Sequence, residues 1–483
     1  MSSSFFNSYF TVIFFVFFVN SAFLYSISKA GHDNTLSHNF KFRVYLKDKG
    51  HNEYTVDNPN QFLTEKAIER KKIQNARIDE SDFPISNDYF NLVQKAGGEV
   101  ISHSKWFKTI VVEVEDSLKI DEISSLSFVD SVKYVWKGIV GNYKKPLRPR
   151  LQQNITSETE SLDTIFGFSA NQFMLHNAEE LYKLGFRGKN IQIGVIDAGF
   201  TNIDVIPAFE NTELLGYENM VPEGDLFSSS DHGVKVLSTM AVNLPGIMIG
   251  SAPEASYYLM RSEDVTSEFP VEEDYWVRAV EHADSLGLDL INTSLGYNEF
   301  DDTDLNYTHD DLTGKISFMS RAADMAYDKG MLIVVSAGNE GNRTWQKSTP
   351  PGDAKNVIAV GAVGTDSLIA SFSSHGHMVD GRIKPDLVSV GRSTVTVGKD
   401  GTIGYTNGTS LSSPFLAGLI ASLWSVNPNL HRSELIDIVM RSSDRYESPD
   451  PVYGYGIPNF QKALTEVLKT VVVEEPVEYK KYE

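Results

Sequence analysis

The sequence predicts an α/β protein with a doubly wound, mostly parallel sheet, preceded by a small ferredoxin-like α+β domain. From about residue 171 onward, short apolar strand-like segments alternate with helix-like ones, a pattern typical of parallel sheets with helices on both faces. Residues 40–136 read instead as strand–helix–strand–strand–helix–strand with one extra helix. The stretch between the two is rich in Gly, Pro, Ser, Thr and Asn, as linkers are.

The bulk composition fits a globular protein of two domains. The chain has 483 residues, with 41% hydrophobic and 11% aromatic residues, which suffices for full cores. Its net charge of -21 argues against nucleic acid or an anionic membrane as a partner, because both require clustered Lys and Arg. The absence of cysteine excludes disulfides, thiolate catalysis and cysteine-ligated zinc.

Residues 1–30 resemble an export signal. An apolar run over residues 10–19 is interrupted only by Thr11, and small residues follow it, as in a cleaved signal peptide. No Lys or Arg precedes the run, so an uncleaved membrane anchor is the alternative. Both interpretations predict a secreted or cell-surface protein.

The first domain is assigned to residues 38–137. Its strand-like segments are 41–48, which Phe40 extends, then 99–104, 107–114 and 131–136. Its helix-like segments are 63–74, 86–98 and 116–129. The domain has no His pair, Gly-rich loop or metal-ligand spacing, so we interpret it as a folding or binding module without chemistry.

The linker is assigned to residues 138–170, the second domain to 171–466 and a C-terminal tail to 467–483. The linker carries a basic cluster of Lys144, Lys145, Arg148 and Arg150 and is expected to be exposed and cleavable. The strand-like segments of the second domain are 190–197, 256–262, 288–294, 331–337 and 356–363, and its helix-like segments are 232–242, 274–287 and 315–330. In such sheets ligands gather beyond the carboxyl ends of the strands, where Asp197 and residues 292–296 and 337–339 fall.

Two candidate residues suit a proton-transfer pair. Asp197 ends an apolar strand, where a carboxylate needs hydrogen-bond donors. His232 opens a helix; if Asp197 accepts from one ring nitrogen, the other can take a proton from a hydroxyl. A turn aspartate and a capping histidine are the simpler interpretations of each residue alone.

Two more candidates suit nucleophilic attack and charge stabilisation. Ser410 lies between a Gly-containing turn and a long apolar helix whose N-terminal N–H groups favour negative charge, and Pro414 suits the first turn of that helix. Asn339 follows Gly338 at a strand end, and its amide is a strong donor to an oxyanion. A helix cap and a Gly-Asn turn are the simpler alternatives.

Taken together, the stretches VIDAG, HGVKVLSTMA, INTSLG, SAGNEG and NGTSLSSP resemble the subtilisin-like serine peptidases. The resemblance covers about residues 171–465, and the order Asp, His, Ser is that of subtilisin. It implies a sheet of the subtilisin type, Ser410 as nucleophile, His232 as general base and acid, Asp197 as orienting acid and Asn339 as oxyanion donor. It also implies that the first domain is an inhibitory prodomain, which the enzyme cleaves off itself.

The sequence departs from the usual family pattern at a few positions. Val234 follows His-Gly where Thr is common, and Leu411 and Ser412 replace a Met-Ala pair. These exchanges roughly keep side-chain size and leave the chemical groups intact, so we do not infer inactivity.

The resemblance also implies where the substrate binds. One wall of the pocket for the residue before the scissile bond would be Ser294, Leu295 and Gly296, the other Ala337 and Gly338, with Ser348 or Thr349 near the base. The segment LMRSEDV would pair with the substrate backbone as an added strand. For Glu263 and Asp264 within it, we favour a solvated acidic loop over selection of basic side chains.

An acidic loop gives the only metal hypothesis. Its members are Asp301, Asp302, Asp304, Asp310 and Asp311. Clustered carboxylates suit a structural calcium ion, but the spacing is not that of an EF-hand and a solvated insertion explains it equally well. The chemistry itself requires no cofactor, and no metal ligands are assigned.

The function predicted is an exported serine endopeptidase, made as a zymogen, that forms an acyl-enzyme. Its expected partners are protein or peptide substrates and its own prodomain, with no nucleic acid, and the expected state is a monomer. A catalytically silent scaffold on the same fold is one alternative. An α/β-hydrolase esterase is another, but the chain lacks G-x-S-x-G and His232 precedes Ser410.

Overall fold

The computed structural model describes residues 38–139 and 165–471. The predicted export segment, most of the linker and most of the C-terminal tail lie outside the described residues. Within the two described ranges, no helix combines the length and the apolar character needed to cross a membrane.

The first domain is built on a four-stranded antiparallel sheet in the order β2-β3-β1-β4. Its strands are β1 (His38–Leu46), β2 (Glu99–Ser104), β3 (Thr109–Val114) and β4 (Val129–Ile139), and its helices are α1 (Glu65–Ile73), α2 (Asn87–Lys95) and α3 (Ile120–Ser124). The core lies between the sheet and α2 and α3, where Val44, Val93, Val112 and Ile123 are fully buried. The ferredoxin-like prediction with an extra helix, α1, is confirmed.

The second domain is built on a seven-stranded sheet in the order β15-β12-β11-β10-β5-β9-β6, in which every pairing is parallel. Its strands are β5 (Gln192–Asp197), β6 (Glu213–Asn219), β9 (Ser256–Arg261), β10 (Leu290–Thr293), β11 (Leu332–Ser336), β12 (Val357–Val363) and β15 (Leu387–Val390). The hairpin strands are β7 (Asn243–Leu244), β8 (Met248–Ile249), β13 (Gly376–His377), β14 (Ile383–Lys384), β16 (Thr394–Val397) and β17 (Ile403–Thr406). This confirms the predicted parallel α/β class.

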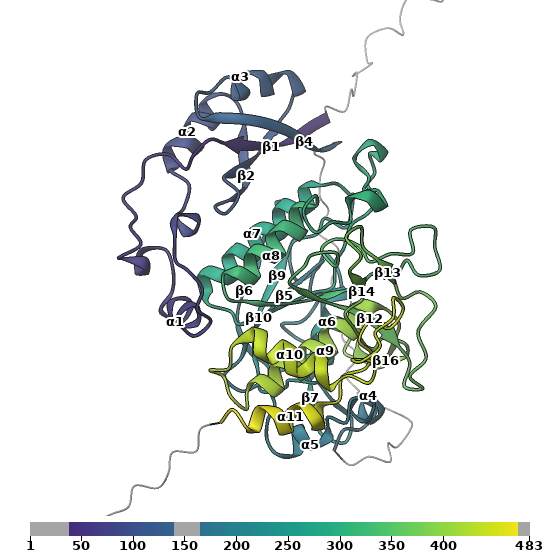
Figure 1. Cartoon of the computed structure of the whole chain (residues 1–483). Coiled ribbons are helices and arrows are strands. Elements are labelled where there is room, and N and C mark those ends of the chain that lie inside the picture. The colour runs from purple at the N-terminus through teal and green to yellow at the C-terminus, as the bar shows by residue number, and fades with distance from the viewer. Residues whose placement is uncertain (1–37, 140–164, 472–483) are drawn as a thin grey trace, which may run out of the picture. The chain divides into compact units, whose positions relative to one another are not determined.

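Helices cover both faces of this sheet (Figure 1). They are α4 (Ala170–Leu175), α5 (Glu179–Lys183), α6 (His232–Ala241), α7 (Val271–Leu286), α8 (Phe318–Asp328), α9 (Thr409–Trp424), α10 (Arg432–Ser442) and α11 (Phe460–Leu468). Alternate residues of β11 separate the two layers, since Leu332 and Val334 pack with α6 and α9, whereas Ile333 and Val335 pack with α7 and α8. A strand buried on both faces reads as a continuous apolar run, which is why these strands were predictable.

The edge strand β6 was not predicted. Its sequence, ELLGYEN, contains Gly216 and lacks an apolar face, and Leu214 and Leu215 are exposed. Pairing with β9 holds it in the sheet, so a long-range contact and not local pattern defines the strand.

The first domain packs on α7 through buried charges. Asp274, Glu281 and Asp284 lie on one face of that helix, spaced seven and three residues apart. Asp274 accepts two hydrogen bonds from the guanidinium of Arg43, at 2.6 and 2.7 Å, and Asp284 accepts from Arg70 and Lys71.

Glu281 completes the row. It accepts from the backbone N–H groups of Lys105, at 2.8 Å, and Trp106, at 3.1 Å, and from the Ser104 hydroxyl. The contact between the two domains is therefore specified by charge and direction as well as by apolar burial.

Candidate active site

Asp197 and His232 form a hydrogen-bonded pair at the carboxyl end of the sheet. Asp197 is the last residue of β5 and is fully buried. Its Oδ1 lies 2.7 Å from Nδ1 of His232 and accepts from the backbone N–H of Ala198 at 2.8 Å. The pair fixes the imidazole so that its other nitrogen, Nε2, is left for a proton from elsewhere.

Gly233 explains why the helix α6 begins so close to β5. Its N–H donates to the carbonyl of Gly199 at 3.0 Å. A Cβ at Gly233 would lie 2.6 Å from that carbonyl oxygen and 2.7 Å from the ring of Phe200. Only glycine therefore lets the first turn of α6 sit on the loop after Asp197, which brings His232 over the carboxylate.

The electrostatic surroundings favour the charged imidazole. Burial alone would lower the pKa of His232, but the charge and hydrogen bond of Asp197, with the charge of Glu263, raise it overall to about 9. The side chain is 36% exposed, so solvent screens part of this field.

Ser410 is the second residue of α9, and Pro414 lies in the second turn of that helix and not in the first as predicted. Proline has no N–H, so the carbonyl of Ser410 loses its usual partner four residues on. The hydroxyl of Ser294 donates to that carbonyl instead, at 2.9 Å. The start of α9 is thereby tied to the wall predicted for the substrate pocket.

Asn339 is oriented by Thr409. The amide oxygen of Asn339 accepts from the N–H of Thr409 at 2.9 Å and from its hydroxyl at 3.1 Å. The amide NH₂ group is therefore the half of this exposed side chain that is left to donate. Among the described residues the structure records no hydrogen bond between the hydroxyl of Ser410 and His232. The recorded link between Ser410 and the cavity is the hydrogen bond that the lining residue Ser294 donates to the Ser410 carbonyl.

The two predicted pocket walls face each other across Thr349. A Cβ at Gly296 would lie 2.3 Å from the Oγ1 of Thr349, and one at Gly338 would lie 3.0 Å from the same atom. Both Thr349 and Ser348 are buried, but only Thr349 is among the nearest atoms to both wall glycines. Of the two residues that the sequence offered for the base, the structure favours Thr349.

A cavity of about 290 Å³ opens beside the Asp197–His232 pair. It is lined by Ala198, Ser230, His232, Glu263, Val265, Glu268, Ser294, Leu295, Gly296 and Tyr297. The cavity thus brings together three predicted wall residues, Ser294, Leu295 and Gly296, and the predicted general base, His232.

Two family descriptions match the chain: residues 188–456 match the subtilase family, and residues 41–153 match the peptidase S8 propeptide domain of Bacteroidota. The chain belongs to the subtilase family. It is 30% identical over 292 residues to subtilisin E of Bacillus subtilis (strain 168), which covers 59% of this chain and 68% of that protein. Subtilisin of Bacillus pumilus is 30% identical over 59% of this chain and 95% of its own length. Serine protease AprX of Bacillus subtilis (strain 168) is 27% identical over 63% and 71% respectively.

The chain is thus a subtilisin-like serine peptidase with a propeptide domain, and the resemblance seen in its motifs is confirmed. The propeptide match covers residues 41–137 of the module without chemistry that was predicted over residues 38–137.

The acidic residues of this subtilase near the cleft do not form the solvated loop that the sequence favoured. Asp264 is 7% exposed and accepts from Thr266 and Ser267, so it shapes the turn after β9. Glu263 is half-buried and faces the cavity. The expectation was wrong because hydrophobic periodicity and amino-acid composition do not show which residues of a loop are buried by other segments of the chain.

The acidic loop over residues 301–311 makes two local hydrogen bonds and one to a residue 33 positions away. Asp302 accepts from the N–H of Asp304, Asp311 from that of Thr308, and Asp301 from that of Glu268. Within the described residues, no three His, Asp or Glu side chains are grouped to hold a metal ion. Structural calcium stays a prediction.

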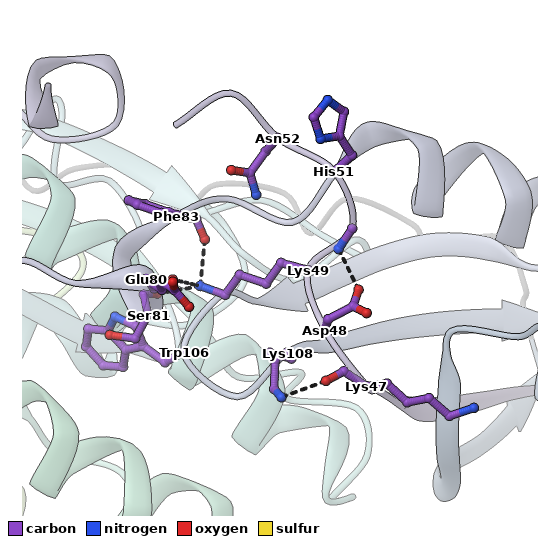
Figure 2. Close-up of a pocket in the computed structure, with 11 residues that line it drawn as sticks. Lys47, Asp48, Lys49, His51, Asn52, Glu80, Ser81, Phe83, Trp106 and Lys108 are labelled. Atoms are coloured by element: carbon purple, nitrogen blue, oxygen red, sulfur yellow. Dashed lines mark hydrogen bonds between the residues drawn. The ribbon is translucent and has the colours of Figure 1, made fainter. Parts of the chain in front are cut away.

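A second cavity, of about 650 Å³, lies in the prodomain and is unrelated to this chemistry (Figure 2). The ammonium of Lys49 donates there to the carbonyls of Glu80, Ser81 and Phe83 at 2.5–2.8 Å, and burial lowers its pKa to about 8. Lys108 donates to the carbonyl of Lys47. These cations fasten the surrounding loops, so the cavity carries no catalytic constellation.

Proposed function

We propose that this subtilase is an exported endopeptidase that hydrolyses proteins through Asp197, His232 and Ser410 and is made as a zymogen with a self-cleaved prodomain. The observation that carries the proposal is the 2.7 Å contact between Asp197 and His232, at a cavity whose wall residue Ser294 holds Ser410. The family membership supports the reaction class.

The proposed chemistry is acyl transfer. The hydroxyl oxygen of Ser410 attacks the substrate carbonyl carbon, and its proton passes to Nε2 of His232. The imidazolium, held by Asp197, gives that proton to the leaving amine, and water then hydrolyses the ester by the same route. The contact between Ser410 and His232 is expected to tighten with substrate bound, as catalytic hydrogen bonds do.

The direct test of this function is covalent labelling. A serine-directed fluorophosphonate should modify the purified protein once per chain, and mass spectrometry of its peptides should place the label on Ser410. A protein that takes no label and leaves an unfolded protein substrate intact would be the silent scaffold instead. The N-terminal mass of the mature form would separate a cleaved signal from an anchor.

Replacing Asn339 with alanine should lower kcat by about 10²–10³-fold, the range found for a lost oxyanion donor. The side chain is oriented by Thr409 with its NH₂ group left to donate. Steady-state kinetics on a peptide substrate would measure the effect. Asn339→Asp is the matched control, because it keeps the acceptor for Thr409 and removes the donor. An undiminished kcat in both variants would exclude Asn339 from the oxyanion site.

Activity should rise with pH, with the acid limb of the kcat/KM profile above the ordinary histidine pKa of about 6.5. Asp197 raises the pKa of His232, so the inactive imidazolium persists to higher pH and activity is lost as pH falls through the raised pKa. Asp197→Asn should shift the limb to lower pH and reduce the rate. Measuring kcat/KM from pH 5 to 10 for the unaltered enzyme and for Asp197→Asn would test both expectations. An acid limb below pH 6 in the unaltered enzyme would refute His232 as the general base.

The zymogen part of the proposal is supported by the described contacts. The indole N–H of Trp136, near the end of β4, donates to the hydroxyl of Ser267 at 3.1 Å, and its ring contacts that of Phe269. These two residues flank Glu268, which lines the cavity. The last strand of the prodomain therefore ends close to residues that flank the cleft. This position suits an inhibitory domain whose C-terminal end is the first substrate of the enzyme.

A further inference from the structure

Two glutamates line the cleft, and the charge of His232 acts on one of them, Glu263. Glu263 and Glu268 both line the cavity beside His232 and are half-buried. Within the described residues, neither carboxylate makes a recorded hydrogen bond or ion pair. Half-buried carboxylates left this way carry a desolvation cost that a bound cation would relieve.

Among the charged groups that act on the two glutamates, carboxylates outnumber cations. Arg261 is the nearest guanidinium, but it is engaged by the carbonyls of Ala198 and Glu223 and by the Asn219 amide oxygen. The other groups whose charges act on the two glutamates are Asp197, His232, Asp264, Glu272 and Asp301. Burial, followed by the charges of neighbouring carboxylates, raises the pKa of Glu263 to about 7 and that of Glu268 to about 8.

A buried tyrosine points to the same ligand chemistry. Tyr297 lines this cavity and is 2% exposed, yet within the described residues its hydroxyl has no hydrogen-bond partner. A phenol oxygen accepts from an N–H donor. An ammonium or guanidinium group in the cavity would satisfy the tyrosine and both carboxylates together.

Strand geometry says which substrate residue reaches this cavity. Successive side chains of an extended peptide point to opposite sides. The residue before the scissile bond, P1, would enter between Gly296 and Gly338, over Thr349. The preceding residue, P2, then faces away from that pocket, toward His232 and Glu263.

We propose that Glu263, Glu268 and Tyr297 form a subsite for a Lys or Arg side chain at P2 of the substrate. This inference rests on the proposed peptidase function and adds a substrate preference to it. A long cationic side chain is flexible enough for its charged end to meet carboxylates beyond His232, and Glu268 lines the same cavity as Glu263.

The chain itself carries peptides of the required charge. Lys137 follows Trp136, and Lys144, Lys145, Arg148 and Arg150 come within eleven residues of the end of β4. The sequence that follows Trp136, whose indole contacts the two neighbours of Glu268, is thus rich in basic residues. Charge complementarity of this kind would draw the linker to the cleft for cleavage.

The test compares two peptides that differ only at P2, with arginine in one and its neutral isostere citrulline in the other. We expect the unaltered mature enzyme to favour arginine in kcat/KM by about 10–100-fold, the usual size of a charge-assisted contact. The ratio should fall near one in the Glu263→Gln/Glu268→Gln double variant and fall in part in Tyr297→Phe. Glu299→Gln, which removes an exposed carboxylate nearby, should keep the full ratio.

The pH dependence gives a second readout. The raised pKa values mean that the carboxylates become neutral on acidification, so the arginine preference should decline as pH falls through about 8 for Glu268 and about 7 for Glu263. Because both peptides meet the same His232, its titration cancels in the ratio. A ratio near one in the unaltered enzyme, or one unchanged in the double variant, would overturn the subsite.

Failure of the subsite is distinguishable from failure of the peptidase assignment. If the citrulline peptide is hydrolysed as fast as the arginine peptide and Ser410 takes a fluorophosphonate label, the enzyme stands and the cation preference falls. If neither peptide is cleaved and no label appears, both proposals fall together.

Discussion

Replacing Ser410 with alanine is expected to abolish peptide hydrolysis and to leave prodomain and peptidase domain as one covalent chain. Loss of the nucleophile lowers kcat of subtilisin by roughly 10⁶-fold, and the same magnitude is expected here. The folded state should be unaffected, because the recorded hydrogen bond of Ser410 to the pocket wall uses its backbone carbonyl, which alanine keeps. Denaturing electrophoresis and an activity assay on the purified protein would measure both effects.

The control is the neighbouring serine that the chemistry does not use. Ser413, one turn beyond Ser410 in α9, is fully buried and donates its hydroxyl to Asn292 of β10 at 2.8 Å. Ser413→Ala should mature and hydrolyse peptides, at some loss of stability. A Ser410→Ala protein that matures normally without an added protease would rule out self-processing.

Replacing Arg43 with methionine should loosen the prodomain without altering the mature enzyme. Arg43 and Asp274 are 2% and 3% exposed, and removing one partner of a buried pair costs about 3–5 kcal/mol, since the other charge stays buried and unpaired. The prodomain should therefore dissociate roughly 10²–10⁴-fold more readily after cleavage. The lag before activity, and the fraction of prodomain that co-elutes with the enzyme, would report this change.

This experiment separates an effect on prodomain binding from an effect on the mature enzyme itself. Once the prodomain has left, the Arg43→Met enzyme has the same sequence as the unaltered one, so its kcat must be equal. Asp274→Leu alone should also weaken the complex, whereas the double variant should recover part of the loss, because no lone charge remains. A lag unchanged in both single variants would mean that this pair does not hold the prodomain.

The fold and the candidate site differ in how far the sequence predicts them. Strands such as β11 and β12 are buried on both faces, so their apolar runs are visible without any partner. The places of Asp197, His232 and Ser410 at the end of β5 and the starts of α6 and α9 could be predicted from local pattern, whereas their catalytic roles stay a proposal. The antiparallel first domain was predictable from its alternation and its helix caps.

The remainder depends on contacts between distant segments. β6 exists through its pairing with β9, and Glu263 faces a cavity because Tyr297 and Ser294 complete it. The choice between Ser348 and Thr349 needed the facing glycines at 296 and 338. The buried pairs of α7 were not foreseen, since Asp274 reads as an ordinary polar helix residue until Arg43, some 231 positions away, is placed against it.

The proline in α9 has a consequence for engineering. Because Pro414 has no N–H, the Ser410 carbonyl depends on the hydroxyl of Ser294 for its hydrogen bond. Substitution of Ser294 to change substrate selectivity would therefore also remove a contact that holds the backbone of the proposed nucleophile. Libraries aimed at a new substrate range are better built at Thr349, whose hydroxyl makes no recorded bond to α9 within the described residues. There the range can change while the speed of the enzyme is retained.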